Sequence, residues 1–149
     1  MDYNSSKEKG MTLIVKTITR LTVGLILLYG IYITLHGHIS PGGGFAGGVI
    51  ITLSFIHLVL AFGKDEALKR ISKAAVSIFE SMGALLFLGV AFLGFVGGYF
   101  FIDWLNKGDV FKLFSAGTIP ISNIAIGLKV SFGLFGVFLV LVLTKFTRN

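Results

Sequence analysis

The sequence predicts an all-α integral membrane protein that crosses the bilayer four times. Charged residues make up only 13% of the 149 residues and hydrophobic residues 54%, whereas a soluble domain carries about 25% charged residues. Four apolar runs are each long enough to span a bilayer, which takes about 20 residues of helix. The basic residues cluster beside these runs, so the formal charge of +6 indicates membrane topology rather than nucleic-acid binding.

The first predicted helix covers residues 11–36, and its first half carries Lys16 and Arg20. These two residues are four apart and share one helical face. We therefore expect this half to lie at the membrane interface, with the long side chains reaching toward the headgroups. The second predicted helix covers residues 44–62 and begins inside a glycine cluster.

The third predicted helix covers residues 74–101, after a charged connection at 63–73. It is longer than a bilayer requires, so it is expected to tilt or to project from the membrane. The fourth covers residues 123–146 and follows a long connection, with Ser122 or Asn123 as its N-cap just after Pro120. Together the four helices are predicted to form one domain over residues 1–149.

The distribution of Lys and Arg predicts that both termini are cytoplasmic. Ten of the 13 basic residues lie at the N-terminal end, in the second connection, or at the C-terminus. The first and third connections hold few or none, so they are expected outside, as in a multi-pass protein of a prokaryotic plasma membrane. The ten residues are Lys7, Lys9, Lys16, Arg20, Lys64, Lys69, Arg70, Lys73, Lys145 and Arg148.

The longest glycine cluster in the chain runs from residue 36 to residue 48, between the first two apolar runs. Glycine permits unusual backbone angles and close approach of another backbone, so this stretch is predicted to be a turn followed by a packing face. Its candidate packing residues are His38, Ser40, Pro41, Gly42, Gly43, Gly44, Phe45, Gly47 and Gly48.

Small residues also recur four apart, a spacing that gives flat helix faces for close packing. These faces could receive helices of this chain or of other subunits, and their number slightly favours other subunits. The pairs are Gly43 and Gly47, Gly44 and Gly48, Gly94 and Gly98, and Gly127 and Ser131.

Three ionisable residues inside the apolar runs are candidates for an ion or proton path: Lys129, Glu80 and His57. A charge at the bilayer centre costs about 2.5–3.5 kcal/mol or more unless it is paired or hydrated. Lys129 could instead be structural and reach the outer headgroups, and His57 could be a hydrogen-bonded core histidine. The predicted topology places Glu80 and His57 toward the cytoplasmic side, where they could communicate, and Lys129 toward the outer side. A direct pair between Lys129 and Glu80 is therefore not expected.

Little in the sequence supports a metal site, a phosphate-binding loop or an enzyme active site. His36 and His38 resemble a metal pair, but zinc needs three or four ligands and the third histidine, His57, is predicted a membrane's width away. The run Gly42–Gly44 lacks the Lys-Ser/Thr of a phosphate-binding loop. The chain has no cysteine, and neither a Ser-His-Asp set nor a carboxylate pair suggests an enzyme. We therefore expect no metal, no cofactor and no catalysis by this chain.

The segment HGHISPGGGFAGG resembles the characteristic segment of the MnhB/MrpB family, small membrane subunits of Mrp-type multisubunit Na⁺/H⁺ antiporters. His38, Ser40, the run Pro41–Phe45, Gly47 and Gly48 carry the match. The four-span layout and the length also fit, so the resemblance covers nearly the whole chain. It implies partner subunits in a lipid bilayer, with Na⁺ and H⁺ as the transported ions. The larger partner subunits would carry the main proton paths.

One position departs from the bacterial pattern. Bacterial members tend to carry an acidic residue in the last helix, where this chain has Lys129. In this respect the chain resembles archaeal members, including those of membrane-bound [NiFe] hydrogenase and related respiratory complexes. The resemblance therefore leaves open a stand-alone antiporter, a redox complex as the parent assembly, and a purely structural scaffold role.

Overall fold

The computed structural model describes residues 11–63, 72–100 and 116–147. Four α-helices and a short 3₁₀ turn make up its regular structure: α1 (Leu13–Leu35), α2 (Gly43–Phe62), α4 (Lys73–Leu93), η1 (Gly94–Gly97) and α5 (Ile119–Thr147). Within this part of the chain, four helices are long and apolar enough to cross a membrane. The prediction of an all-α protein with four spans is confirmed to that extent.

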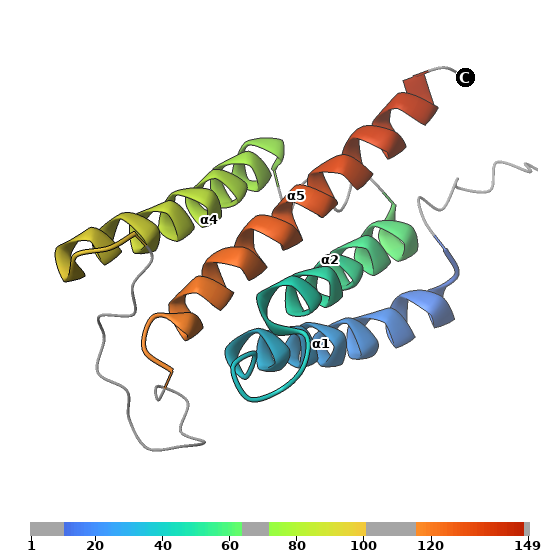
Figure 1. Ribbon diagram of the computed structural model, residues 1–149. Helices are drawn as coiled ribbons and strands as arrows, with labels where there is room; N and C mark the ends of the chain where they lie inside the picture. Colours follow the sequence, from blue (N-terminus) through green and yellow to red (C-terminus); the bar gives the residue numbers. More distant parts are fainter. Residues whose placement is uncertain (1–10, 64–71, 101–115, 148–149) are drawn as a thin grey trace, which may run out of the picture.

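The helices lie in an open row rather than a closed bundle. Figure 1 shows the order α1, α2, α5, α4 across the molecule. α1 packs along α2, α2 packs against α5, and α5 packs against α4, whereas α1 touches α5 only lightly. Because α5 stands between α2 and α4, the last helix of the chain joins the N-terminal helix pair to α4.

The apolar core lies where α2, α4 and α5 meet. Val59, Val76, Phe135 and Leu139 are buried there together. The Phe55 and Phe135 rings lie 5.4 Å apart between their centroids. Such ring pairs add about 0.5–1.5 kcal/mol beyond the area they bury, so aromatic contacts reinforce α5 as the central helix.

α1 and α2 approach closely because glycines face each other between them. A Cβ atom on Gly47 would overlap the Thr34 hydroxyl and lie 2.8 Å from the Gly30 carbonyl oxygen. A Cβ atom on Gly30 would in turn lie 2.8 Å from Ile51 Cγ1. Thr34 donates its hydroxyl hydrogen to the Gly30 carbonyl at 2.9 Å, so the polar group in this contact is satisfied.

The third helix is shorter than predicted. α4 ends at Leu93 and η1 ends at Gly97, whereas the predicted helix continued to residue 101, which lies outside the described residues. Gly98 has a left-handed φ of 103°, a conformation that ends helices readily because glycine has no Cβ. Gly94 and Gly98 therefore do not form one helical packing face, contrary to the prediction.

The fourth helix begins earlier than predicted, at Ile119 instead of residue 123. Pro120 falls in the first turn, where a missing N–H breaks no intrahelical bond. The predicted N-caps are wrong: Ser122 donates to the Thr118 carbonyl at 3.1 Å from within the helix, and Asn123 also lies inside it.

Candidate functional site

An ion pair joins α4 to α5. The Lys129 ammonium donates to Glu80 Oε1 at 2.5 Å. Relative to full exposure, 48% of the Lys129 side chain and 35% of the Glu80 side chain remain open in the single chain. The pair is thus formed within the subunit, but the surrounding helices of this chain cover only part of it.

The pair lies near the middle of both helices. Glu80 is three residues before Gly83, the midpoint of α4, and Lys129 is four residues before Gly133, the midpoint of α5. At 1.5 Å per residue these offsets are about 4.5 Å and about 6 Å. Since each helix is long enough to cross the membrane, both charges belong to the central part of the span.

The early start of α5 explains why the two residues meet, although no direct pair was expected from the sequence. Because α5 begins at Ile119 instead of residue 123, Lys129 is the eleventh residue of a 29-residue helix. It therefore lies farther from the helix start than the sequence indicated. Glu80 is eighth in a helix of 21 residues. The expectation that Lys129 and Glu80 do not pair directly is wrong.

Gly83 allows α4 to come close enough for the pair to form. A Cβ atom on this residue would lie 2.6 Å from the Lys129 backbone nitrogen and 2.9 Å from the Ala125 carbonyl oxygen. Real Cβ atoms do not approach backbone atoms this closely, so a larger residue would push the helices apart. Sequence reasoning did not single out Gly83, although it stands three residues after Glu80 and therefore on the same helical face.

His57 belongs to a different contact. Its Nε2 atom lies 3.1 Å from the Thr19 hydroxyl oxygen, across the α1–α2 boundary. Thr19 is almost fully buried, and sequence reasoning did not single it out. His57 therefore faces α1 while Glu80 faces α5 on the other side of α2, so the structure does not bring these two candidates together.

Replacing Thr19 by valine is expected to lower the unfolding free energy by about 0.6 kcal/mol, the mean value for hydrogen bonds between membrane helices. Thr17→Val is the matched control, because the Thr17 hydroxyl donates to the Leu13 carbonyl of its own helix. Denaturant titration of the chain in detergent measures both. Thr19→Val should cost nothing further in a His57→Phe background, and an equal loss with and without His57 would contradict the contact.

The glycine cluster forms the turn between α1 and α2. The His36 carbonyl accepts hydrogen bonds from the Ser40 backbone N–H at 2.9 Å and from the Ser40 hydroxyl at 3.0 Å. Gly42 and Gly43 have φ angles of 120° and 57°, which a residue with a Cβ rarely adopts. The chain can therefore reverse and start α2 within a few residues only because glycine stands at these positions.

Asn123 links this turn to α5 by a hydrogen bond, a role that sequence reasoning missed. Its Oδ1 atom accepts the Gly44 backbone N–H at 3.3 Å, at a helix start where donors lack intrahelical partners. A Cβ on Gly44 would overlap the Asn123 carbonyl group. In the sequence, an asparagine shortly after a proline is typical of a helix N-cap. The sequence therefore did not indicate that Asn123 contacts Gly44, 79 residues away.

The glycine faces of α2 point to helices of this same chain. Gly44 and Gly48 face α5, where Gly48 meets Val130 and the Gly127 carbonyl, whereas Gly47 faces α1. Gly43 points at Asn123 rather than sharing a face with Gly47, so this predicted pair is wrong. The slight preference for other subunits as occupants of these faces is also wrong for Gly44, Gly47 and Gly48.

The remaining residues of the cluster lie at the surface of the turn or partly under it. Pro41 and Phe45 are exposed and His38 is half-buried. The His36 ring stacks on Tyr32, with centroids 4.1 Å apart, and its Nδ1 atom lies 3.0 Å from the Tyr32 carbonyl oxygen. Among the described residues, no group of three potential metal-ligating side chains is found.

Comparison with known proteins identifies the family. Residues 14–136 match the family model described as a domain related to the MnhB subunit of Na⁺/H⁺ antiporters. The chain belongs to the MnhB family. The matched range includes α1, α2, α4 and the part of α5 that carries Lys129, so the row of helices and the ion pair lie within the MnhB region.

Two curated relatives are similar to parts of this chain. The uncharacterised protein MJ1307 of Methanocaldococcus jannaschii is 43% identical over 118 residues, which is 74% of this chain and 44% of that protein. The candidate antiporter subunit mnhB2 of Staphylococcus aureus (strain Newman) is 41% identical over 58 residues, 39% of this chain and 41% of that protein. The matched regions thus span less than half the length of each relative.

A solved structure shares the fold. A chain of the membrane-bound sulfane sulfur reductase, an archaeal respiratory membrane complex, superposes with a TM-score of 0.74 and is 31% identical. The match covers 89% of this chain and 60% of that one. An MnhB family chain with four helices long and apolar enough to cross a membrane is a multi-pass membrane protein.

Proposed function

We propose that this chain is a non-catalytic subunit of an Mrp-type Na⁺/H⁺ antiporter module and contributes Lys129 and Glu80 to its cation or proton path. The MnhB family match supports the module. Na⁺ and H⁺ are the transported ions, and the larger subunits carry the main translocation machinery. The subunit also helps to assemble the complex, because the glycine turn and the central helix α5 hold its own four helices in place.

The observation that carries this proposal is the half-open ion pair in the middle of the membrane span. An ionisable residue at this depth is costly, and membrane proteins retain such residues chiefly along ion and proton pathways. A Lys–Glu pair can exchange a proton internally, or can open so that the carboxylate receives a cation. A purely packing role could be filled by apolar side chains at lower cost.

Orientation follows from charge. We propose that both termini face the cytoplasm, with the α1–α2 turn and the connection between α4 and α5 on the outer side. The support is the concentration of Lys and Arg at the two ends of the chain and in the connection before α4, in keeping with the excess of positive charge in cytoplasmic loops.

The parent assembly has two candidates. One is a stand-alone antiporter, in keeping with the name of the S. aureus relative. The other is a respiratory membrane complex that contains the same module, either a [NiFe] hydrogenase or a complex of the sulfane sulfur reductase kind. The likeness over 89% of this chain to a subunit of the archaeal reductase favours the respiratory candidate.

Lys129→Met tests the transport role, because methionine keeps an unbranched side chain only one atom shorter and removes the charge. We expect Na⁺/H⁺ exchange in everted membrane vesicles, compared at equal amounts of assembled complex, to fall by about tenfold or more. Ile124→Met, on an exposed position of α5 away from the pair, is the control. Unchanged exchange by an intact Lys129→Met complex would leave this subunit a scaffold.

A further inference from the structure

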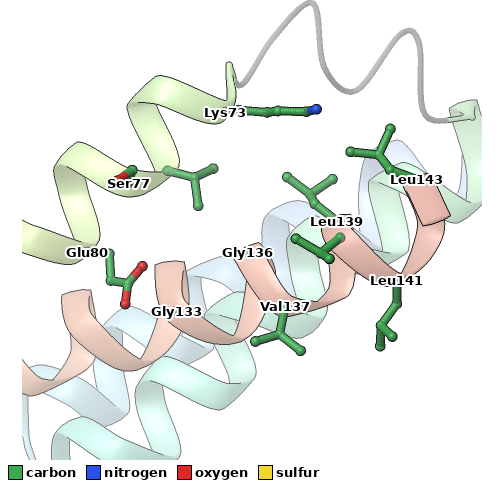
Figure 2. A pocket seen from close by; sticks show the side chains of 11 residues that line it. Lys73, Ser77, Glu80, Gly133, Gly136, Val137, Leu139, Leu141 and Leu143 are labelled. Atoms are coloured by element: carbon green, nitrogen blue, oxygen red, sulfur yellow. The ribbon is translucent and has the colours of Figure 1, made fainter.

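A groove with a volume of about 510 Å³ follows the contact between α4 and α5. Lys73, Ser77 and Glu80 line it from α4, and Gly133, Gly136 and Val137 line it from α5. Figure 2 shows Glu80 beside α5 near Gly133 at one end and Lys73 near Leu143 at the other. The groove thus runs from the start of α4 to the ion pair in the middle of the span.

Gly133 and Gly136, the glycines that line this groove, have no neighbour among the described residues close enough to require glycine. A Cβ on Gly133 would lie 3.7 Å from Glu80 Oε1, and one on Gly136 would lie 3.5 Å from Val76 Cγ1. Both distances are ordinary van der Waals contacts, in contrast to the 2.6 Å at Gly83. An alanine would therefore fit at either position, and glycine here keeps the groove open for something outside the chain.

The ion pair at the end of the groove is incompletely satisfied. A lysine ammonium has three donors, and Glu80 is the only acceptor that Lys129 reaches among the described residues. Lys129 stands one helical turn before Gly133, and nearly half of its side chain is open. In the apolar centre of a bilayer the remaining donors need acceptors, which lipid chains do not offer.

We infer that a transmembrane helix of another subunit docks in this groove, presents small residues to Gly133 and Gly136, and offers a hydrogen-bond acceptor side chain to Lys129. Small residues let helix backbones approach closely in lipid, and interhelical polar contacts favour one register. The inference builds on the proposed function, because it supplies the partner that completes the Lys129–Glu80 site. The occupant is a helix and not a lipid, since an acyl chain could fill the groove but cannot accept a hydrogen bond from the Lys129 ammonium.

Cysteine cross-linking in the assembled complex tests this docking, and the natural chain has no cysteine. Ser77→Cys and Val137→Cys place a thiol on each wall of the groove, and both positions are exposed in the single chain. Leu25→Cys on α1, at the opposite edge of the row and 62% exposed, is the control. Each variant is labelled in membranes with a maleimide–benzophenone reagent, irradiated, and mapped by mass spectrometry.

Both groove variants should form an adduct with one apolar segment of the same partner subunit, and Leu25→Cys should not reach that segment. The segment should carry a side chain that accepts a hydrogen bond. Replacing that residue by leucine should reduce the yield of the Ser77→Cys adduct by about tenfold, which corresponds to the loss of one hydrogen bond to a charged group. Adducts with phospholipid only, labelling by a membrane-impermeant maleimide, or a segment without any acceptor would each overturn the inference.

The two proposals fail separately. If Lys129→Met transports normally while the groove variants still reach the partner segment, the transport role is wrong and the docking stands. If exchange falls as expected while the groove variants reach only lipid or water, the docking is wrong and the transport role stands. Cross-linking yield does not depend on ion exchange, so it reports docking in either case.

Discussion

Gly47→Leu is expected to prevent assembly of the complex rather than merely slow transport. The new side chain would start from a Cβ that overlaps the Thr34 hydroxyl and lies 2.8 Å from the Gly30 carbonyl oxygen. Backbone atoms cannot turn aside as a flexible side chain can, so α1 and α2 would have to separate. We expect a cost of about 3 kcal/mol or more, at the upper end for overpacked sites. Blue-native electrophoresis of detergent-solubilised membranes measures the amount of complex.

The matched controls are Gly24→Leu in α1 and Gly89→Leu in α4. A Cβ at either position meets no atom of the described residues within 4 Å. The gain in helix propensity from glycine to leucine is comparable at interior helix positions. At least one control should assemble to the wild-type level. A Gly47→Leu complex that assembles normally but transports slowly would contradict the packing role.

Removing Glu80 alone is expected to have the second large effect. Glu80→Leu leaves the Lys129 ammonium without its acceptor near the centre of the span. A charge left without a partner near the bilayer centre costs about 2.5–3.5 kcal/mol or more, so we expect the variant complex to accumulate to a small fraction of the wild-type amount. Ser81→Ala on the neighbouring, exposed position of α4 is the control for substitution in this helix.

Adding Lys129→Leu to Glu80→Leu should restore assembly without restoring transport. The double variant replaces the pair with two apolar side chains, and such replacements are often neutral or stabilising. Assembly is measured by the yield of purified complex, and transport by Na⁺/H⁺ exchange in vesicles made from the same preparation. A double variant that assembles and exchanges ions at the wild-type rate would show that the pair serves neither process.

The sequence predicted the membrane class and the existence of the four helices because these depend on local composition. Runs of about 20 apolar residues with few charges have little alternative but to span a bilayer as helices. The glycine cluster likewise predicted a turn, because its backbone angles require glycine at particular residues such as Gly42 and Gly43. The motif also predicted the MnhB family, which the match over residues 14–136 confirms.

The helix ends were less predictable, and one of them changed the candidate site. Pro120 predicted a helix that starts after it, but proline is also favourable in a first turn, and only the backbone distinguishes the two cases. Starting α5 at Ile119 moved Lys129 toward the middle of the span. The sequence thus identified Lys129 and Glu80 as unusual residues but not that they pair.

The sequence by itself determined what kind of protein this is: an all-α, multi-pass membrane chain with a glycine turn and a few costly charges in its apolar runs. Only the tertiary structure decided which residues meet. The order α1, α2, α5, α4 brought Glu80 to Lys129, His57 to Thr19 and Asn123 to Gly44. The physical reason is that spanning is set by the hydropathy of each segment alone, whereas these contacts depend on where glycines let particular helices approach.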